Sequence, residues 1–364
     1  MDNVERRDDL LTAYQRDMAV WDACAEAYED HIVSGHSDIA AYEAFEEDLL
    51  DRILLHLIRD KGRRVRLLDV GCGSGRLHLR YGLKAVDASR LPEDDAALVR
   101  RARATAAAYA PEPHLRTGLS NVDGLDFSRS MIEMARRKLV EAGLGNAVEP
   151  HLGLECGSAF DLQPLESDPL PVAVSVCNTV GVIQGPAGAA KLFDSMRRCV
   201  ESAGGIAIIT GYRRSAIPDF ALPGYESTMS VSGQPVWLGP DTYAGSEYVQ
   251  VPRAYKRAYD PDPTVTVDVF LRDGSPVARG HTLTRRADAV RETCNSGHIR
   301  THTDYESRWY SIEQFREWIR AYWGEERSRH IAGGRLDSLR AAQTQIAVLD
   351  CGGLLEDLPA RWGL

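Results

Sequence analysis

Apolar residues recur at helical spacing early in the chain and at strand spacing further on. From residue 10 to residue 58 the pattern predicts helices. Their core-facing band consists of Phe45, Leu49, Ile53 and Leu57, widened by Leu50 and Leu54. The run VRLLDV that follows is short and continuously apolar, as in a buried strand. A helical layer is therefore expected to precede the first strand of a sheet.

Strand-like runs and helices alternate up to about residue 215. VRLLDV is followed by VDGLDFS, PVAVSVCNTV and GGIAIITGY. Two amphipathic helices, SRSMIEMARRKLVEAG and GAAKLFDSMRRCVESAG, lie between these runs, and Ser130 with Glu133 suggests a capping box for the first helix. Such alternation predicts a doubly wound α/β fold with a mostly parallel sheet, covered by helices on both faces.

The segment RLPEDDAALVRRARATAAAYAP adds a further helix near residues 91–110. Pro92 suits its first turn, and three acids, Glu93, Asp94 and Asp95, suit the positive end of its dipole. Pro111 ends the pattern. We regard this helix as an insertion within residues 1–215.

The pattern changes beyond residue 215. Residues 216–310 read as an antiparallel β-rich cap, in which Asp273-Gly274 forms a hairpin turn and HIRTHTDYESRWY alternates in polarity. Residues 311–364 are expected to supply C-terminal helices that complete the core. The first of them, SIEQFREWIRAYW, carries an apolar stripe of Ile312, Phe315, Ile319 and Tyr322.

Composition narrows the class of protein. The chain has 364 residues, of which 44% are hydrophobic, so a substantial core is available. Its net charge of -10 disfavours nonspecific binding to nucleic acid or to anionic membranes, since both require positive charge. The seven cysteines include no C-x-x-C pair, and the N-terminus is polar. With no apolar run of membrane-spanning length, these features predict a soluble, cytoplasmic protein without bound metal.

Three glycines follow the first strand at alternate positions: Gly71, Gly73 and Gly75. Glycine permits positive φ and lets a ligand approach the backbone without a Cβ in the way. The spacing G-x-G-x-G differs from the G-x-G-x-x-G of dinucleotide sites, and Arg76 stands in the next position. A G-K-[ST] phosphate loop is also absent from the sequence.

Four stretches together resemble the class I S-adenosylmethionine-dependent methyltransferases of small molecules. They are LLDVGCGSG, GLDFSRSMIEMARRKL, GSAFDL and VAVSVCNTVGVI, and the resemblance covers roughly residues 20–215. It implies a sheet of the seven-stranded type, S-adenosylmethionine as cofactor and S-adenosylhomocysteine as product. It also implies a small-molecule acceptor.

The resemblance carries roles over to individual residues. Asp126 would accept hydrogen bonds from the ribose hydroxyls, and Asn178 would lie beside the aminocarboxyl group. Tyr28 resembles a tyrosine that closes over the cofactor in several small-molecule members. The other implied cofactor-binding residues are Asp69, Gly71, Cys72, Gly73 and Gly75 in the first motif, Phe127 and Met131 in the second, and Ser158, Ala159 and Phe160 in the third.

One departure from the family leaves an alternative open. Asp126 follows Gly75 at more than twice the usual distance of about twenty residues, because the 91–110 helix intervenes. Asp87 stands at the shorter spacing and is a rival for the ribose acid, although the motif SRSMIEMA follows Asp126 and not Asp87. The inserted helix itself could be a lid, a contact in a homodimer or part of the substrate wall.

Candidate catalytic residues follow the strand GGIAIITGY, at the end where such sheets face substrate. Tyr212 and Arg213 leave GGIAIITGY directly, and an arginine there could hold a carboxylate with both branches of its guanidinium. His302 could act as a base near neutral pH. It belongs to a row of alternating polar residues that a solvated strand face would explain equally: His298, Arg300, His302, Asp304, Glu306 and Arg308.

These features predict an enzyme that transfers a methyl group from S-adenosylmethionine to a small-molecule acceptor. The arginine favours an amino acid or an amino-acid-derived metabolite. Two alternatives stay open, a protein methyltransferase and a protein that binds the cofactor without transferring its methyl group.

Overall fold

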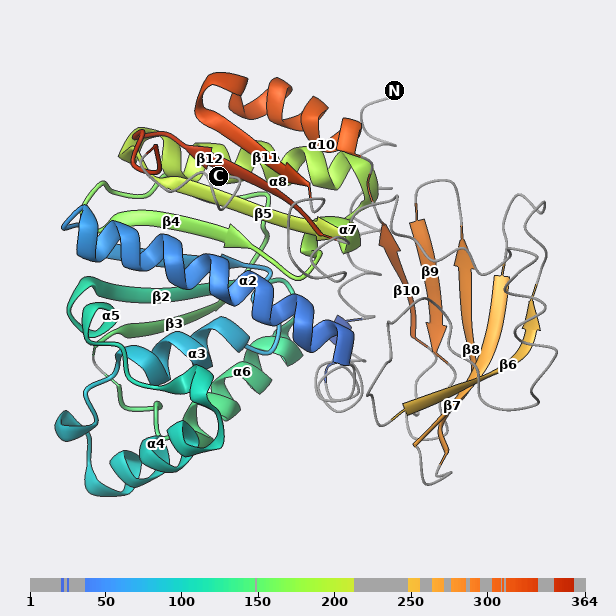
Figure 1. Ribbon diagram of the computed structural model, residues 1–364, viewed down its shortest axis with the longest axis horizontal. Coiled ribbons are helices and arrows are strands. Elements are labelled where there is room, and N and C mark those ends of the chain that lie inside the picture. Colours follow the sequence, from blue (N-terminus) through green and yellow to red (C-terminus); the bar gives the residue numbers. More distant parts are fainter. Residues whose placement is uncertain are drawn as a thin grey trace.

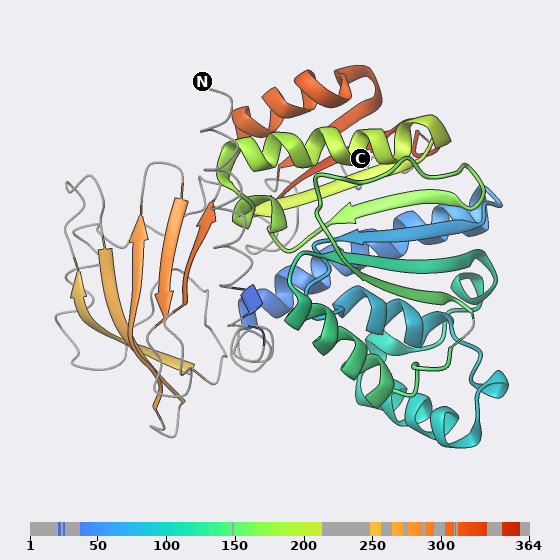
Figure 2. The ribbon, with the colours of Figure 1, turned by 180° about the vertical axis from the view of Figure 1, so that it is seen from behind.

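The computed structural model describes twelve stretches of the chain: 21–22, 25, 37–147, 149–212, 248–255, 264–271, 276–285, 289–294, 303–308, 310, 312–332 and 344–356. Their strands form a seven-stranded sheet and a five-stranded sheet. Figures 1 and 2 show the two sheets side by side, with helices on both faces of the larger one.

The larger sheet has the order β11-β12-β5-β4-β1-β2-β3. Its strands are β1 (Val65–Val70), β2 (Leu119–Asp126), β3 (His151–Cys156), β4 (Leu170–Ser175), β5 (Ile206–Tyr212), β11 (Ser328–Ala332) and β12 (Thr344–Asp350). All pairs from β5 to β3 are parallel, and β12 alone runs antiparallel to both of its neighbours. The predicted fold class, a mostly parallel sheet of the seven-stranded type, is confirmed.

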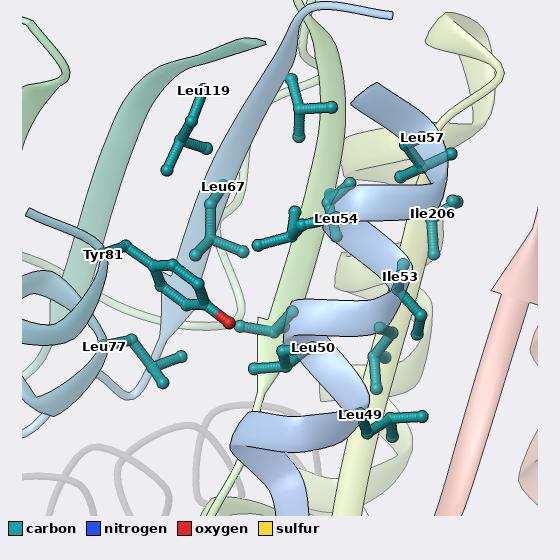
Figure 3. Close-up of a cluster of buried hydrophobic side chains, with 14 of the residues drawn as sticks. Leu49, Leu50, Ile53, Leu54, Leu57, Leu67, Leu77, Tyr81, Leu119 and Ile206 are labelled. Atoms are coloured by element: carbon teal, nitrogen blue, oxygen red, sulfur yellow. The ribbon is translucent and has the colours of Figure 1, made fainter. Parts of the chain in front are cut away.

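Helix α2 (Ser37–Leu55) covers one face of this sheet. The apolar band predicted from the sequence is buried apart from Phe45, which is half-buried. Figure 3 shows Leu54 directed toward Leu67, with Ile53 and Leu57 on the side of Ile206. The helix continues as a π turn, His56–Asp60. Beside it lie α3 (Arg76–Ala85) and α6 (Arg129–Glu141). The spacing of the band therefore identified the element that closes this side of the core.

The opposite face is covered by α7 (Thr179–Val182), α8 (Gly185–Val200) and α10 (Ile312–Trp318), which continues as the π turn Ile319–Trp323. Aromatic side chains join α8 to the C-terminal helix. Phe193 packs on Trp323 with ring centroids 4.8 Å apart, and the indole N–H of Trp323 donates to the Phe193 carbonyl at 2.8 Å. Phe315 meets Phe193 edge to face.

The sequence predicts helices for residues 311–364, but this segment forms strands as well as helices. After α10 and its π turn, the chain forms β11 and β12. Residues 344–349 of β12 are all buried, because this strand lies between β5 and β11 with helices above and below. A short continuous apolar run such as IAVL is typical of a strand covered on both faces, which explains the difference.

The N-terminal cap of α6 is Ser128, not Ser130 as predicted. Ser128 has extended backbone angles, and its Oγ accepts a hydrogen bond from Met131 N at 3.2 Å. The same hydroxyl donates to Asp22 Oδ1 at 2.6 Å, and Ser130 N donates to that oxygen at 3.1 Å. A side chain from the N-terminal segment thus satisfies a backbone donor that the capping box would otherwise have served.

The inserted helix α4 (Glu93–Thr105) is followed by a 3₁₀ turn, Ala107–Tyr109, and by α5 (Pro113–Gly118). Val99 of α4 is buried among apolar residues at the C-terminal ends of α3 and α6: Leu83, Val86, Leu139, Ala142 and Leu144. Arg103 donates to the carbonyls of Leu83 and Val86 at 2.8 and 2.7 Å. The insertion therefore lies at the end of α3 opposite the glycines, a position that does not suit a lid over them.

The smaller sheet has the order β10-β9-β8-β7-β6, and all of its pairs are antiparallel. Its strands are β6 (Tyr248–Tyr255), β7 (Thr264–Leu271), β8 (Pro276–Arg285), β9 (Ala289–Cys294) and β10 (Thr303–Arg308). Strand β10 lies next to α7, at the edge toward which β4 and β5 point. The turn predicted at Asp273-Gly274 lies outside the described residues.

Among the residues that the structure describes, no helix has both the length and the apolar character needed to cross a bilayer.

Candidate functional site at the carboxyl edge of the sheet

The three glycines form the turn between β1 and α3, and each has positive φ: 79° at Gly71, 50° at Gly73 and 80° at Gly75. A Cβ on Gly71 would lie 2.5 Å from Thr179 Cγ2, and one on Gly75 would lie 2.8 Å from Ala135 Cβ. A Cβ on Gly73 would meet nothing within 4 Å. Two glycines thus permit close packing within the protein, whereas the middle one borders open space that a ligand can approach.

Backbone hydrogen bonds tie this loop to the end of β2. The amides of Gly71 and Cys72 both donate to the Leu125 carbonyl, at 2.7 and 3.1 Å. The Cys72 side chain is buried, and burial raises the pKa of its thiol well above the usual value. Cys72 therefore contributes a neutral, apolar underside to the loop and no thiolate.

Asp126 ends β2 directly beside the glycine loop. Its Oδ2 accepts from Gly73 N and its Oδ1 from Ser128 N, both at 2.9 Å. Asp126 is only 7% exposed. Burial raises the pKa of Asp126 to about 6, against the opposing effect of the hydrogen bonds from the Ser128 and Gly73 amides.

Asp87, the rival acid, lies elsewhere. It caps the 3₁₀ turn Ala88–Arg90, where its Oδ1 accepts from Ser89 N at 3.1 Å and from Ser89 Oγ at 2.7 Å. This turn follows the C-terminal end of α3, whereas the glycine loop precedes its N-terminal end. Of the two acids, only Asp126 stands at the loop.

Asp69 is a second buried carboxylate beneath the loop. It lies in β1 and is 2% exposed, and its Oδ1 has no hydrogen-bond partner. Burial raises the pKa of Asp69 to about 7; the Arg76 charge opposes this effect, while Asp126 and Glu46 add to it. A buried acceptor without a donor is costly, so an ammonium group nearby, which carries N–H donors, would satisfy it.

The turn after β4 forms the next wall of the site. Cys177 and Asn178 have φ of 55° and 58°, both in the left-handed region, and Asn178 is 1% exposed. Non-glycine residues adopt this conformation at a cost, and such strain is found where function fixes a turn. Helix α7 begins at the next residue, Thr179, whose side chain packs on Gly71.

The third motif lies after β3 and is fixed to β2, since Gly157 N donates to the Asp126 carbonyl at 2.9 Å. Ser158 Oγ accepts from Phe160 N at 3.2 Å, and Lys191 Nζ stands 5.4 Å from the centre of the half-buried Phe160 ring. Ala159 is also half-buried. The loops after β1, β2, β3 and β4 therefore meet at one edge of the sheet.

The two predicted residues of the second motif differ in exposure. Phe127, next to Asp126, is half-buried. Met131 is buried with Met134 and Ala25, beside Trp21 of the N-terminal segment. Met131 therefore helps to seat the N-terminal segment on α6, and its predicted role near the adenine stays a prediction.

The predicted catalytic residues are only partly placed. Arg213, His302 and the cofactor-closing Tyr28 lie outside the described residues. Tyr212 ends β5, where its backbone pairs with Thr344, and its side chain is not among those described. Strand β5 thus delivers Tyr212 to the same edge as the glycine loop, and the catalytic roles stay predictions.

Sequence reasoning missed Glu46, a fully buried acid on α2. Its Oε2 pairs with Arg76 Nη2 at 2.8 Å, and its Oε1 accepts from Cys177 N at 2.7 Å and from Thr210 Oγ1. Burial raises its pKa, against the opposing charge of Arg76. The available signal was position, because Glu46 stands four residues before Leu50 and eight before Leu54, in the apolar row of α2.

A second missed signal was the match of charges between α2 and α3. Glu47 pairs with Arg76 at 3.0 Å and with Arg80 at 2.7 Å, and Asp51 pairs with Arg80 and with Lys84, both at 2.6 Å. The bases recur at four-residue intervals on one side of α3. These ion pairs fix α2 beside the helix that begins at the glycine loop.

Acidic groups dominate the described part of the site. Glu46, Asp69 and Asp126 stand around the loop, and Arg76 is the base that Glu46 and Asp69 share. No group of three His, Cys, Asp or Glu suited to a metal ion occurs among the described residues. The site therefore favours a ligand that carries positive charge near Gly73.

No protein-family model and no curated protein matches the chain. Among solved structures, it is similar to a S-adenosylmethionine-dependent methyltransferase from Clostridium acetobutylicum, with 13% identity, 90% of this chain and 98% of that chain covered, and a TM-score of 0.42. The CcbJ methyltransferase from Streptomyces caelestis gives 13% identity, coverage of 91% and 97%, and a TM-score of 0.44.

A third similar structure is CalS10, an amino pentose methyltransferase from Micromonospora echinaspora, with 15% identity, coverage of 85% and 95%, and a TM-score of 0.36. At these values the likeness leaves the activity and the acceptor to be argued from the residues of this chain.

Proposed function

We propose that this protein is an S-adenosylmethionine-dependent methyltransferase that acts on a small molecule. The observation that carries the proposal is the meeting of the open Gly73 with two buried carboxylates, Asp126 and Asp69. The cofactor combines ribose hydroxyls, an ammonium group and a sulfonium, so it offers hydrogen-bond donors and positive charge to such a site. The motifs quoted from the sequence support the same assignment.

The described residues fit the parts of this cofactor. Both Asp126 oxygens already accept one backbone amide, and a carboxylate retains capacity for two ribose hydroxyls. The unpartnered Asp69 Oδ1 suits the ammonium group, and Asn178 stands in the adjoining turn. When bound, the cofactor supplies an electrophilic methyl group, while the protein orients the acceptor and removes a proton where the acceptor requires it.

The acceptor is proposed to enter at the same edge, between the glycine loop and the five-stranded sheet. Strand β5 ends there with Tyr212, and β10 lies next to α7. Arg213 would hold an acceptor carboxylate, and His302 would serve as base. An amino acid or an amino-acid-derived metabolite is the proposed acceptor class.

Calorimetry with S-adenosylmethionine tests the cofactor site. Asp126→Ala should weaken binding by about 1–3 kcal/mol, the scale of hydrogen bonds to a charged group. Asp87→Ala is the matched control, since it removes a carboxylate that caps a remote turn, and its affinity should equal that of the wild type. Loss of binding in Asp87→Ala alone would overturn the assignment of the ribose acid.

Intact-mass analysis tests transfer. The enzyme is incubated with S-adenosylmethionine and a panel of amino acids, amino-acid-derived metabolites and peptides, and each acceptor is weighed for an added methyl group. Methylation confined to peptides would favour a protein methyltransferase instead. Tight cofactor binding without methylation of any panel member would support a protein that binds the cofactor without using it.

A further inference from the structure

Glu46 is an unusual residue to bury where it stands. The apolar row on α2 continues from it to Leu50 and Leu54, which pack on the sheet. A carboxylate in such a row must leave water, and burial accordingly raises its pKa. An apolar side chain would cover the sheet at lower cost, so packing alone does not explain an acid at this position.

The carboxylate instead joins three segments of the site. Its Oε2 holds Arg76, the first residue of α3 after the glycine loop, at 2.8 Å. Its Oε1 accepts from the amide of Cys177, in the turn after β4, at 2.7 Å and from the Thr210 hydroxyl of β5. One side chain thus bridges the loop after β1, the turn after β4 and the end of β5.

The turn that Glu46 holds is strained and packs against the glycine loop. Cys177 and Asn178 are consecutive residues in the left-handed region, a conformation that persists only where the surroundings enforce it. The next side chain, Thr179, fills the space beside Gly71. A shift of this turn would therefore move both Asn178 and the wall of the glycine loop.

We propose that Glu46 is a positioning residue for the cofactor, which fixes the Cys177–Asn178 turn and the glycine loop in their binding geometry. The inference rests on the proposed function and extends it to an N-terminal helix that does not itself belong to the motifs. Glu46 acts through Arg76 and the Cys177 amide and makes no contact with the cofactor.

Glu47 offers a matched control on the same helix. It pairs with the same arginine, through Arg76 Nη1 at 3.0 Å, and with Arg80 Nη1 at 2.7 Å. Among the described residues, its hydrogen bonds are with Arg76 and Arg80 of α3, and none is with the turn after β4. Glu46→Gln and Glu47→Gln therefore both remove one negative charge opposite Arg76, and only the first weakens the hold on the Cys177 turn.

The experiment combines binding with local exchange. Calorimetry with S-adenosylhomocysteine is performed well below the unfolding temperature of each variant. Glu46→Gln should bind about tenfold more weakly or worse, whereas Glu47→Gln should stay within about twofold of the wild type. Without ligand, amide exchange in residues 177–181 should accelerate in Glu46→Gln and remain unchanged in Glu47→Gln.

Each outcome decides a separate claim. If both variants bind like the wild type, or lose affinity equally, Glu46 has no positioning role. If the wild type itself binds neither S-adenosylmethionine nor S-adenosylhomocysteine, the proposed function fails instead. Should Glu46→Gln not fold, Thr210→Val takes its place, because it removes the hydroxyl that donates to Oε1. A loss of about threefold is expected, and no loss would overturn the inference.

Discussion

The methyl group of Thr179 stands where a Cβ of Gly71 would have to lie, with only 2.5 Å between the two positions. Through this contact the backbone of Gly71, in the loop after β1, packs directly against the helix that follows β4. The two loops therefore form one surface, and a change in either is transmitted to the other.

Replacement of Gly71 by alanine should destabilise the protein more than replacement of Gly73. Gly71→Ala combines a left-handed residue with a collision, at a cost of about 2–4 kcal/mol. Gly73→Ala meets open space and should cost about 1–2 kcal/mol, yet it places a methyl group where the cofactor is proposed to approach. Urea denaturation measures the first difference and calorimetry with S-adenosylmethionine the second. Equal unfolding free energies would contradict the packing described for Gly71.

His78 should make the fold sensitive to acid. It is fully buried on α3, Nε2 lies 3.0 Å from the Gly153 carbonyl, and burial lowers its pKa to about 4. Between about pH 6.5 and pH 4 the unfolded chain binds a proton here that the folded chain does not, so stability falls as the pH falls. The slope contributed is at most about 1.4 kcal/mol per pH unit.

Urea denaturation of wild type and His78→Gln across this range isolates the effect, because the other titrating groups are common to both. The difference in unfolding free energy should be constant above about pH 7 and should narrow as the pH falls toward 4. A difference that stays constant over the whole range would mean that the imidazole is protonated equally in both states.

Cofactor affinity should fall on acidification for a separate reason. The pKa of Asp126 is raised to about 6 and that of Asp69 to about 7, so below these values the free protein holds protons that a cationic ligand must displace. Affinity for S-adenosylmethionine should not change with pH above about pH 8. Below about pH 7 it should drop by up to about tenfold per pH unit for each of the two carboxyl groups.

Calorimetry in two buffers of different ionisation enthalpy checks this directly, because displaced protons add the heat of the buffer. Asp69→Asn should shift the onset of the fall from about pH 7 to about pH 6. Affinity that does not change from pH 8 to pH 5 would show that neither carboxylate faces the ligand.

The inserted helix should be indifferent to the cofactor. Helix α4 packs on the C-terminal ends of α3 and α6, away from Gly75. S-adenosylhomocysteine should slow amide exchange at residues 71–75 and 126–131 and leave residues 93–105 unchanged, as hydrogen-exchange mass spectrometry can measure. Protection of 93–105 by the ligand would restore the lid interpretation.

The sequence predicted the features that depend on residues close together in the chain. The apolar band of α2, the strand before the glycines and the acid that ends β2 were all readable, because burial and backbone freedom impose their own spacing on the sequence. Glu46 was not, since its partners Arg76, Cys177 and Thr210 come together only through the topology of the sheet. From the sequence alone, the charge of Glu46 indicates a side chain exposed to solvent, because its three partners are close to it only in the folded protein.

The true cap of α6 was missed for the same reason. The sequence does not distinguish Ser128 from Ser130 as the cap. Asp22, more than a hundred residues earlier, accepts hydrogen bonds from the Ser128 hydroxyl and from the Ser130 amide, and so favours Ser128 as the cap. The strand β12 was overlooked because a short apolar run does not by itself distinguish a strand from a helix. Its identity follows from the partners on either side.

The position of β12 also bears on how the chain is made. On the ribosome, β5 emerges long before β12, so the edge of β5 that β12 will occupy has no strand partner until residues 344–350 have been synthesised. Among the described strands, β11 pairs with β12 alone and must wait for it too. Release of the nascent chain before residue 344 would leave an apolar strand edge open to other chains, which makes the interval between the synthesis of β5 and that of β12 a step exposed to aggregation.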